Sequence, residues 1–233
     1  MADNYNDMTG VLMLEKVTPV IEALFGHLEL DPKYQGNGQA YIAVKAEMTS
    51  TSWRHPIDEL EPLADKWGLA PEGGFEGPEE ILRALAAHFG AIQNEDVAAL
   101  IEQVDFNEED ADLEALFLLA QVFDDGHGLK GIDTEGSWTS NRHRLGHFGG
   151  YGMYLTKNVR VTCCSSQANQ LGTALDQALE SNNLEDAAKA LAKDIGTVLA
   201  SMNDEEKRHA IRLFLAELLT QDNLAGEGKG NRQ

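Results

Sequence analysis

The stretch YLTKNVRVTCC, residues 154–164, decides the fold class that the sequence predicts. Apolar and β-forming residues alternate on both sides of Lys157 and Asn158, and an asparagine tolerates the left-handed conformation that a tight hairpin turn needs. Residues 126–153, which precede this hairpin, are rich in glycine and aromatic residues. Residues 126–164 are therefore predicted to form a small antiparallel sheet.

After the hairpin, apolar residues recur at helical spacing to the end of the chain. Residues that commonly cap helices precede each run, so three helices are predicted to begin near Ser165 or Ser166, at Asn183 and at Asn203. We expect these helices to form a C-terminal helical bundle. The glycine-rich, polar stretch 225–233 is predicted to be a disordered tail.

Before the hairpin, residues 1–125 are predicted to be mainly helical with one strand. Alternating apolar and polar side chains place that strand at about residues 39–48. Capping residues, proline and helical periodicity predict helices that begin at Pro19, Pro56, Pro78, Asn94 and Asn107. The chain is thus expected to be an α+β protein, predominantly helical, with an acidic N-terminal region of residues 1–125 and a second region of residues 126–233.

The composition limits the classes of partner. The 233 residues include 39 acidic and 18 basic side chains, which gives a formal net charge of −21. Such a charge repels nucleic acid and anionic membranes and favours a cationic partner, although it also serves solubility. The two cysteines of the chain, Cys163 and Cys164, are adjacent, and neighbouring cysteines form only a strained ring, so a disulfide scaffold is excluded. No signal peptide or membrane-spanning run is recognisable, so a cytoplasmic location is expected.

Charge is also segregated along the chain. No lysine or arginine occurs between Ala84 and Leu129, and no acidic residue occurs from Gly136 to Leu175. Acidic residues in a first helical turn complement the helix dipole without any ligand, but the absence of basic partners on the same helices is not explained in this way. We therefore predict a partner-binding acidic face, formed by Glu95, Asp96, Glu102, Asp105, Glu108, Glu109, Asp110 and Asp112.

An alternative site is predicted around the glycine-rich string 146–152. Histidines, carboxylates and arginines near expected strand ends can bind a metal or a phosphate if the fold gathers them. The residues of this alternative ligand site are Asp125, His127, Arg142, His143, Arg144, His147 and Tyr151. Their spacing matches no known ligand motif, so no metal, cofactor or catalytic residue is assigned.

A second alternative is single-stranded nucleic-acid binding by residues 136–175. Aromatic residues that stack on bases and basic residues that contact phosphates occur together there. They are Trp138, Arg142, Arg144, Tyr151 and Tyr154. The simpler explanation is that the aromatics belong to the core and that the basic residues face the protein's own acidic helices.

In size, acidity and lack of an enzyme motif, the chain resembles the small acidic inhibitors carried by phages and plasmids, the anti-CRISPR and antirestriction proteins. The resemblance rests on the carboxylates between Glu95 and Asp125, because DNA-mimicking members of this class place such groups where phosphates lie on a duplex. It implies a non-catalytic protein that binds and inhibits a nucleic-acid-handling complex of the host through that complex's basic residues. We expect fast, salt-sensitive association.

Overall fold

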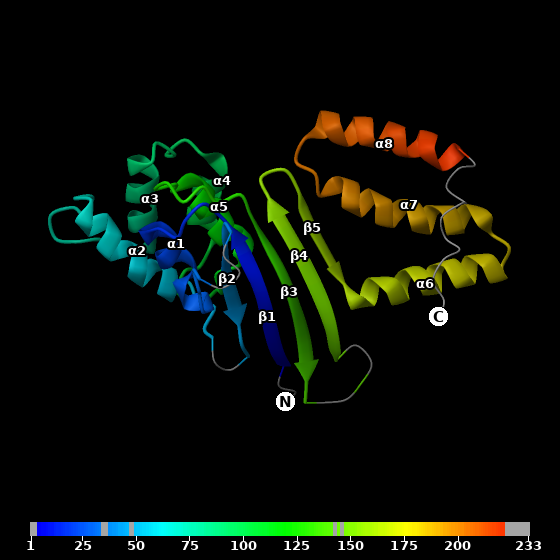
Figure 1. Ribbon diagram of the computed structural model, residues 1–233, viewed down its shortest axis with the longest axis horizontal. Coiled ribbons are helices and arrows are strands. Elements are labelled where there is room, and N and C mark those ends of the chain that lie inside the picture. The colour runs from blue at the N-terminus through cyan, green and yellow to red at the C-terminus, as the bar shows by residue number, and fades with distance from the viewer. Residues whose placement is uncertain (1–3, 34–36, 47–48, 142–143, 145–146, 222–233) are drawn as a thin grey trace. The chain divides into compact units, whose positions relative to one another are not determined.

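The computed structural model describes residues 4–33, 37–46, 49–141, 144 and 147–221, and within them it contains eight helices and five strands. The expected α+β fold is confirmed (Figure 1). The chain divides into two compact units, which are described separately. The first unit comprises Met1–Thr156 and Thr162–Ser166, and the second unit comprises Lys157–Val161 and Gln167–Gln233. The predicted disordered tail, 225–233, lies outside the described residues.

The sheet has five strands in the order β2-β1-β3-β4-β5. They are β1 (Asn4–Met13), β2 (Gln39–Val44), β3 (Gly131–Ser140), β4 (Phe148–Thr156) and β5 (Arg160–Cys164). The predicted antiparallel sheet and the turn at Lys157 and Asn158 are confirmed, but two strands from the N-terminal region complete it. Of the single strand predicted at 39–48, residues 39–44 form β2, and residues 47 and 48 lie outside the described residues.

The strand β1 was not predicted, although it lies next to the sheet's centre (Figure 1). Its first seven residues, Asn4 to Gly10, are rich in residue types that are depleted in strands, so their strand propensity is low. Pairing along its whole length with β3, from Asn4 opposite Ser140 to Met13 opposite Gly131, overrides that propensity. This pairing crosses the predicted boundary between residues 125 and 126, so segments from both sides of that boundary share one sheet.

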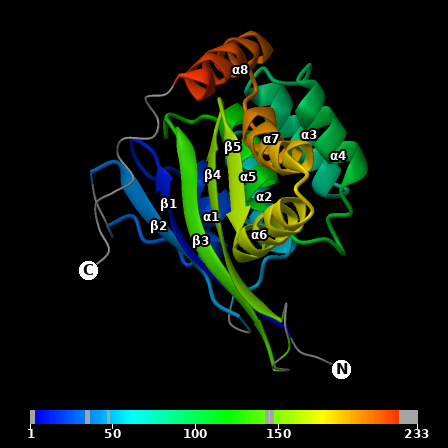
Figure 2. The ribbon, with the colours of Figure 1, turned by 90° about the vertical axis from the view of Figure 1, so that its right-hand side faces the viewer.

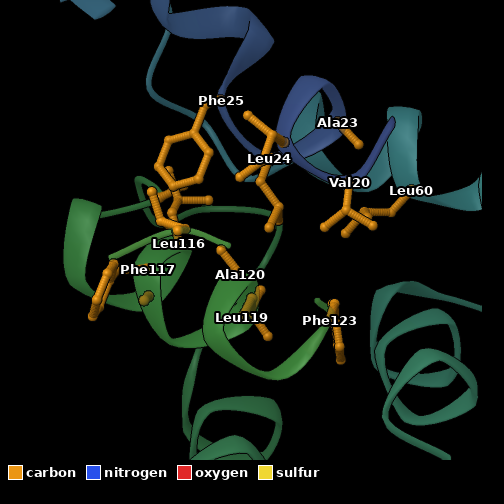
Figure 3. Close-up of a cluster of buried hydrophobic side chains, with 14 of the residues drawn as sticks. Val20, Ala23, Leu24, Phe25, Leu60, Leu116, Phe117, Leu119, Ala120 and Phe123 are labelled. Atoms are coloured by element: carbon orange, nitrogen blue, oxygen red, sulfur yellow. The ribbon is translucent and has the colours of Figure 1, made fainter. Parts of the chain in front are cut away.

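Helices of the first unit cover one face of the sheet (Figure 2). They are α1 (Pro19–Phe25), α2 (Arg54–Lys66), α3 (Pro78–His88), α4 (Glu95–Gln103) and α5 (Leu113–Val122), with a 3-10 turn η1 (Gly26–Leu28) after α1. The covered face, called the inner face below, includes Met8, Leu12, Ile132 and Leu155. Figure 3 shows how α1, α2 and α5 close the core, with side chains such as Phe25, Leu60 and Leu116 fully buried.

The prediction that a helix begins at Asn107 is wrong. Residues 105–111 form a turn and an irregular segment, and α5 begins at Leu113 with Asp112 as its N-cap. The segment is held away from helical geometry because buried Phe106 packs against Trp53 and the Ala111 N–H donates to the Thr51 carbonyl at 2.7 Å. Tertiary anchoring thus overrides the local helix-start signal.

The second unit contains most of three C-terminal helices, α6 (Ser165–Glu180), α7 (Leu184–Ala200) and α8 (Glu205–Thr220). Their predicted positions are confirmed, and Asn183 caps α7 as expected. The N-cap of α8 is Asp204 and not Asn203, whose side-chain amide instead donates to the Lys157 carbonyl at 2.7 Å. Among the described residues of these helices, the buried ones are Ala178, Ala187 and Leu199.

Candidate functional site

The eight carboxylates of the predicted acidic face are all exposed. They follow one another along the chain on α4, in the 105–111 segment and at the N-cap of α5, all within the first unit. Within the described part of the chain, none of them lies within ion-pairing distance of a basic side chain. None of the eight therefore forms an ion pair with a described lysine or arginine, although Arg83 and Glu102 line one small hollow between α3 and α4.

Three of these carboxylates accept hydrogen bonds from backbone N–H groups close to them in the chain. Asp112 accepts from the Ala115 N–H at 2.7 Å and so caps α5. In the turn, Asp105 accepts from the Asn107 N–H at 3.0 Å, and Glu109 accepts from the Asp105 N–H at 3.2 Å. These contacts shape the loop through backbone donors and not through basic side chains.

Asp125, predicted as part of the alternative ligand site, has a structural position. Its carboxylate accepts hydrogen bonds from the Thr18 hydroxyl and, at 3.2 Å, from the Val20 N–H. A carboxylate in this position stabilises the first turn of α1 by binding a free backbone donor. Asp125 thus ties the start of α1 to the segment that leads into β3.

His127 is part of the same structural loop. It is 1% exposed, and its Nδ1 accepts a hydrogen bond from the Leu129 N–H at 2.9 Å. Neighbouring Asp124 accepts from the N–H groups of Gly126 and His127 at 2.9 and 3.0 Å. Burial by itself raises the pKa of Asp124, but these backbone donors, that of Gly128 and nearby His127 lower the pKa below its usual value.

The other described basic members of the alternative site lie at the opposite end of β3. Arg144 and His147 belong to the loop between β3 and β4, while Arg142 and His143 lie outside the described residues. The ten-residue strand β3 spans roughly 30 Å, which separates these side chains from Asp125 and His127. Among the described residues, no group of three or more histidine, cysteine or carboxylate side chains is arranged to hold a metal ion.

Tyr151 is fixed on the inner face of the sheet. Its hydroxyl donates to Asn6 Oδ1 at 3.1 Å, and its ring stacks on Trp138 with the centroids 6.2 Å apart and the planes 23° from parallel. The ring lies directly over Gly136, where a Cβ atom would collide with it. Tyr154 lies three residues further along β4, so its side chain is on the opposite face of the sheet, where it is 42% exposed. The structure thus brings Trp138 and Tyr151 together, but not Tyr154.

A cleft of about 330 Å³ lies between the inner face and the N-terminal end of α5, and we call it the α5 cleft. It brings Tyr151 of the alternative site together with Asp110 and Asp112 of the acidic face. Its described lining consists of Asn6, Met8, Leu28, Val44, Thr51, Asp110, Ala111, Asp112, Leu113, Glu114, Thr134, Tyr151 and Met153. Sequence reasoning missed Asn6, Met8 and Thr134, because no local signal places β1 beside β3.

A second hollow, of about 540 Å³, lies beside the other end of the same loop, between α2 and the start of α3. Phe106 and Asn107 contribute to its lining, together with the carboxylates Asp58, Glu61 and Glu76. Its basic member, Arg54, lies 3.6 Å from Asp58. The acidic 105–112 loop is therefore flanked by two concave surfaces in the first unit.

No family model matches the chain, and neither the curated proteins nor the solved structures include a significantly similar one. In the described part of the chain, every helix is too short or too polar to cross a lipid bilayer.

Proposed function

We propose that the protein is a non-catalytic inhibitor that acts in the cytoplasm by binding a basic, nucleic-acid-handling protein complex. Its acidic face meets the surface with which that complex holds phosphates. The observation that carries the proposal is the set of eight exposed carboxylates between Glu95 and Asp112, none of which is ion-paired with a described residue. Such a single-sign surface steers a cationic partner and repels nucleic acid itself.

Affinity capture from nuclease-treated cell extract, followed by mass spectrometry, provides the first test. The expected result is a stoichiometric nucleic-acid-binding complex that is released by raised salt, because screening weakens interactions between exposed charges. A capture that retains no basic complex at low or moderate salt contradicts the proposal.

Charge reversal then tests the surface. Replacing Glu108, Glu109 and Asp110 together with lysine is expected to lower the association rate constant roughly tenfold or more at low ionic strength. The matched control replaces three other exposed carboxylates with lysine, namely Glu59, Asp65 and Glu72 in and after α2, and so changes the net charge equally. Equal slowing by both triple variants means that only net charge matters, and an unchanged rate in the first removes the electrostatic argument.

Binding of single-stranded nucleic acid by residues 136–175 is the second candidate. The stacked Trp138 and Tyr151 favour it, because such aromatic rings provide stacking surfaces for bases. An oligonucleotide gel shift that disappears when Arg142 and Arg144 are replaced supports this function. The metal- or phosphate-binding enzyme remains a prediction, which metal analysis of the purified protein tests directly.

A further inference from the structure

Thr134 in the α5 cleft has a buried hydroxyl without a partner. Its side chain is 1% exposed, and Oγ1 makes no hydrogen bond with any residue that the structure describes. Its methyl group lies over Gly10 of the neighbouring strand, where the backbones of β1 and β3 approach closely. Buried hydroxyl groups are usually hydrogen-bonded, so this residue of the cleft lining has unused capacity to donate and accept hydrogen bonds.

Tyr151 forms a rigid wall of the same cleft. One face of its ring covers Gly136, so the opposite face points away from the sheet, toward the space in front of α5. The hydrogen bond to Asn6 and the stack with Trp138 hold the ring in this orientation without a ligand. An aromatic face that is already ordered attracts a planar cation at little entropic cost.

The rim of the cleft is acidic. Asp110, Asp112 and Glu114 contribute to its lining, and its described lining includes no lysine, arginine or histidine. Asp112 is partly engaged by the N–H of Ala115, so Asp110 is the rim carboxylate most clearly available to a ligand. The charge of the rim therefore favours a positively charged group over a neutral or anionic one.

The rest of the lining is apolar and suits an aliphatic stem. Met8 and Met153 lie on opposite sides of Thr134 on the inner face, where Met8 belongs to β1 and Met153 is paired directly with Thr134. Methionine side chains adapt to the shape of what they contact. A volume of about 330 Å³ is small for a ligand pocket, which suits a single long side chain better than a large metabolite.

We propose that the α5 cleft receives one arginine side chain of the bound partner protein. On binding, the adaptable side chains of Met8 and Met153 move aside and uncover the buried Thr134 hydroxyl. The guanidinium then stacks on Tyr151 and donates to this hydroxyl and to the carboxylates at the rim, and its stem lies against the methionines. Arginine fits better than lysine because it is planar and presents five donors in fixed directions. This inference rests on the proposed function, and it makes the cleft the specific part of an otherwise electrostatic interface.

The test uses the full-length protein with methyl-labelled methionines and the tripeptide acetyl-Gly-Arg-Gly-amide. We expect saturable shifts of the Met8 and Met153 methyl signals, whereas Met13 and Met202, which do not line the cleft, stay unchanged. The same peptide with citrulline in place of arginine has nearly the same shape without the charge. Equal shifts with citrulline, or no saturable shift at Met8 and Met153 up to the solubility limit of the peptide, overturn the inference.

Substitutions at Thr134 and Asp110 locate the binding site. Thr134→Val keeps the shape but removes the hydroxyl, and it is expected to weaken binding of the arginine peptide roughly three- to tenfold, while Thr134→Ser restores most of the affinity. Asp110→Asn changes an exposed side chain and is expected to weaken the same binding if Thr134→Val does not fold. Unchanged affinity in the folded variants overturns the assignment.

Partner capture separates this inference from the proposed function. If Thr134→Val and Asp110→Asn capture the partner complex as strongly as the unaltered protein, the cleft inference fails and the acidic-face proposal stands. If no basic complex is captured but the arginine peptide binds the cleft, the proposed function fails and the cleft remains an arginine-binding site.

Discussion

The first unit buries the apolar faces of its helices, whereas the second unit leaves most of its own exposed. Leu60 on α2 is fully buried, but Leu213 and Phe214 on α8 are 59% and 65% exposed. Both units show apolar residues at helical spacing, so the same pattern produced a core in one unit and an exposed surface in the other. Periodicity therefore predicts that a helix forms, but not whether another element covers its apolar face.

The largest expected difference concerns buried and exposed leucines. Leu60→Ala is expected to lower the free energy of unfolding by about 3 kcal/mol, because it removes buried methyl groups and leaves a cavity. Leu213→Ala, at an exposed position, is expected to change it by less than about 0.5 kcal/mol. Urea denaturation monitored by tryptophan fluorescence measures the first value, since Trp53 and Trp67 belong to the first unit, and far-UV circular dichroism, to which the helices of the second unit contribute, measures the second value.

Equal destabilisation by the two substitutions contradicts this contrast and means that the apolar face of α8 is covered in solution. Sedimentation of Leu213→Ala then shows whether the cover is a second copy of the chain, because loss of that contact lowers the molecular mass in solution.

The second prediction uses pH to distinguish the units. Burial, with a contribution from stacked His55 at 6.0 Å, lowers the pKa of His27 from 6.5 to about 4. Between these values the unfolded chain binds a proton that the folded chain does not, so stability falls as the pH drops from 6.5 toward 4. The loss is on the order of 2 kcal/mol after allowance for solvent screening.

Urea denaturation at several pH values measures this slope. His27→Phe is expected to reduce the slope between pH 6.5 and 4, whereas His209→Phe, at an exposed position of the second unit, is expected to leave it unchanged. A slope that survives in His27→Phe assigns the acid sensitivity to another group.

The smallest expected effect concerns two asparagine caps. Asn94 accepts from the Val97 N–H at 3.1 Å, and Asn183 accepts from the Asp186 N–H at 3.2 Å. Each substitution by alanine is expected to cost about 1 kcal/mol of helix stability. Hydrogen exchange should show Asn94→Ala weakening protection across the packed first unit, and Asn183→Ala weakening it in α7 alone. Loss of protection in both units from either change contradicts their independence.

Sequence reasoning predicted best where the signals are local. Asn94 was placed correctly as a cap because its side-chain hydrogen bond reaches only three residues along the chain, and the hairpin turn at Lys157 and Asn158 was equally local. The start at Asn107 failed because Phe106 and Ala111 are anchored by residues more than fifty positions earlier. Local preference is weak against such tertiary contacts.

The candidate site was predicted only in pieces. The exposure of the acidic residues followed from their chemistry, but the α5 cleft depends on strand register. Thr134 and Tyr151 face α5 only because β1, β3 and β4 pair as they do, and a shift of one residue would turn these side chains to the other face. Nothing near Thr134 in the sequence indicates that its hydroxyl lacks a partner.

The position of β1 between β2 and β3 has a consequence for synthesis of the protein. The strand β1 leaves the ribosome before β2 and β3, so it can pair early with β2, but its other edge waits for residues 131–140. At about 5–20 residues per second, that wait lasts on the order of 10 s. During it, the growing chain exposes an open strand edge to other nascent chains and to chaperones, so the yield of folded protein depends on how quickly β3 arrives.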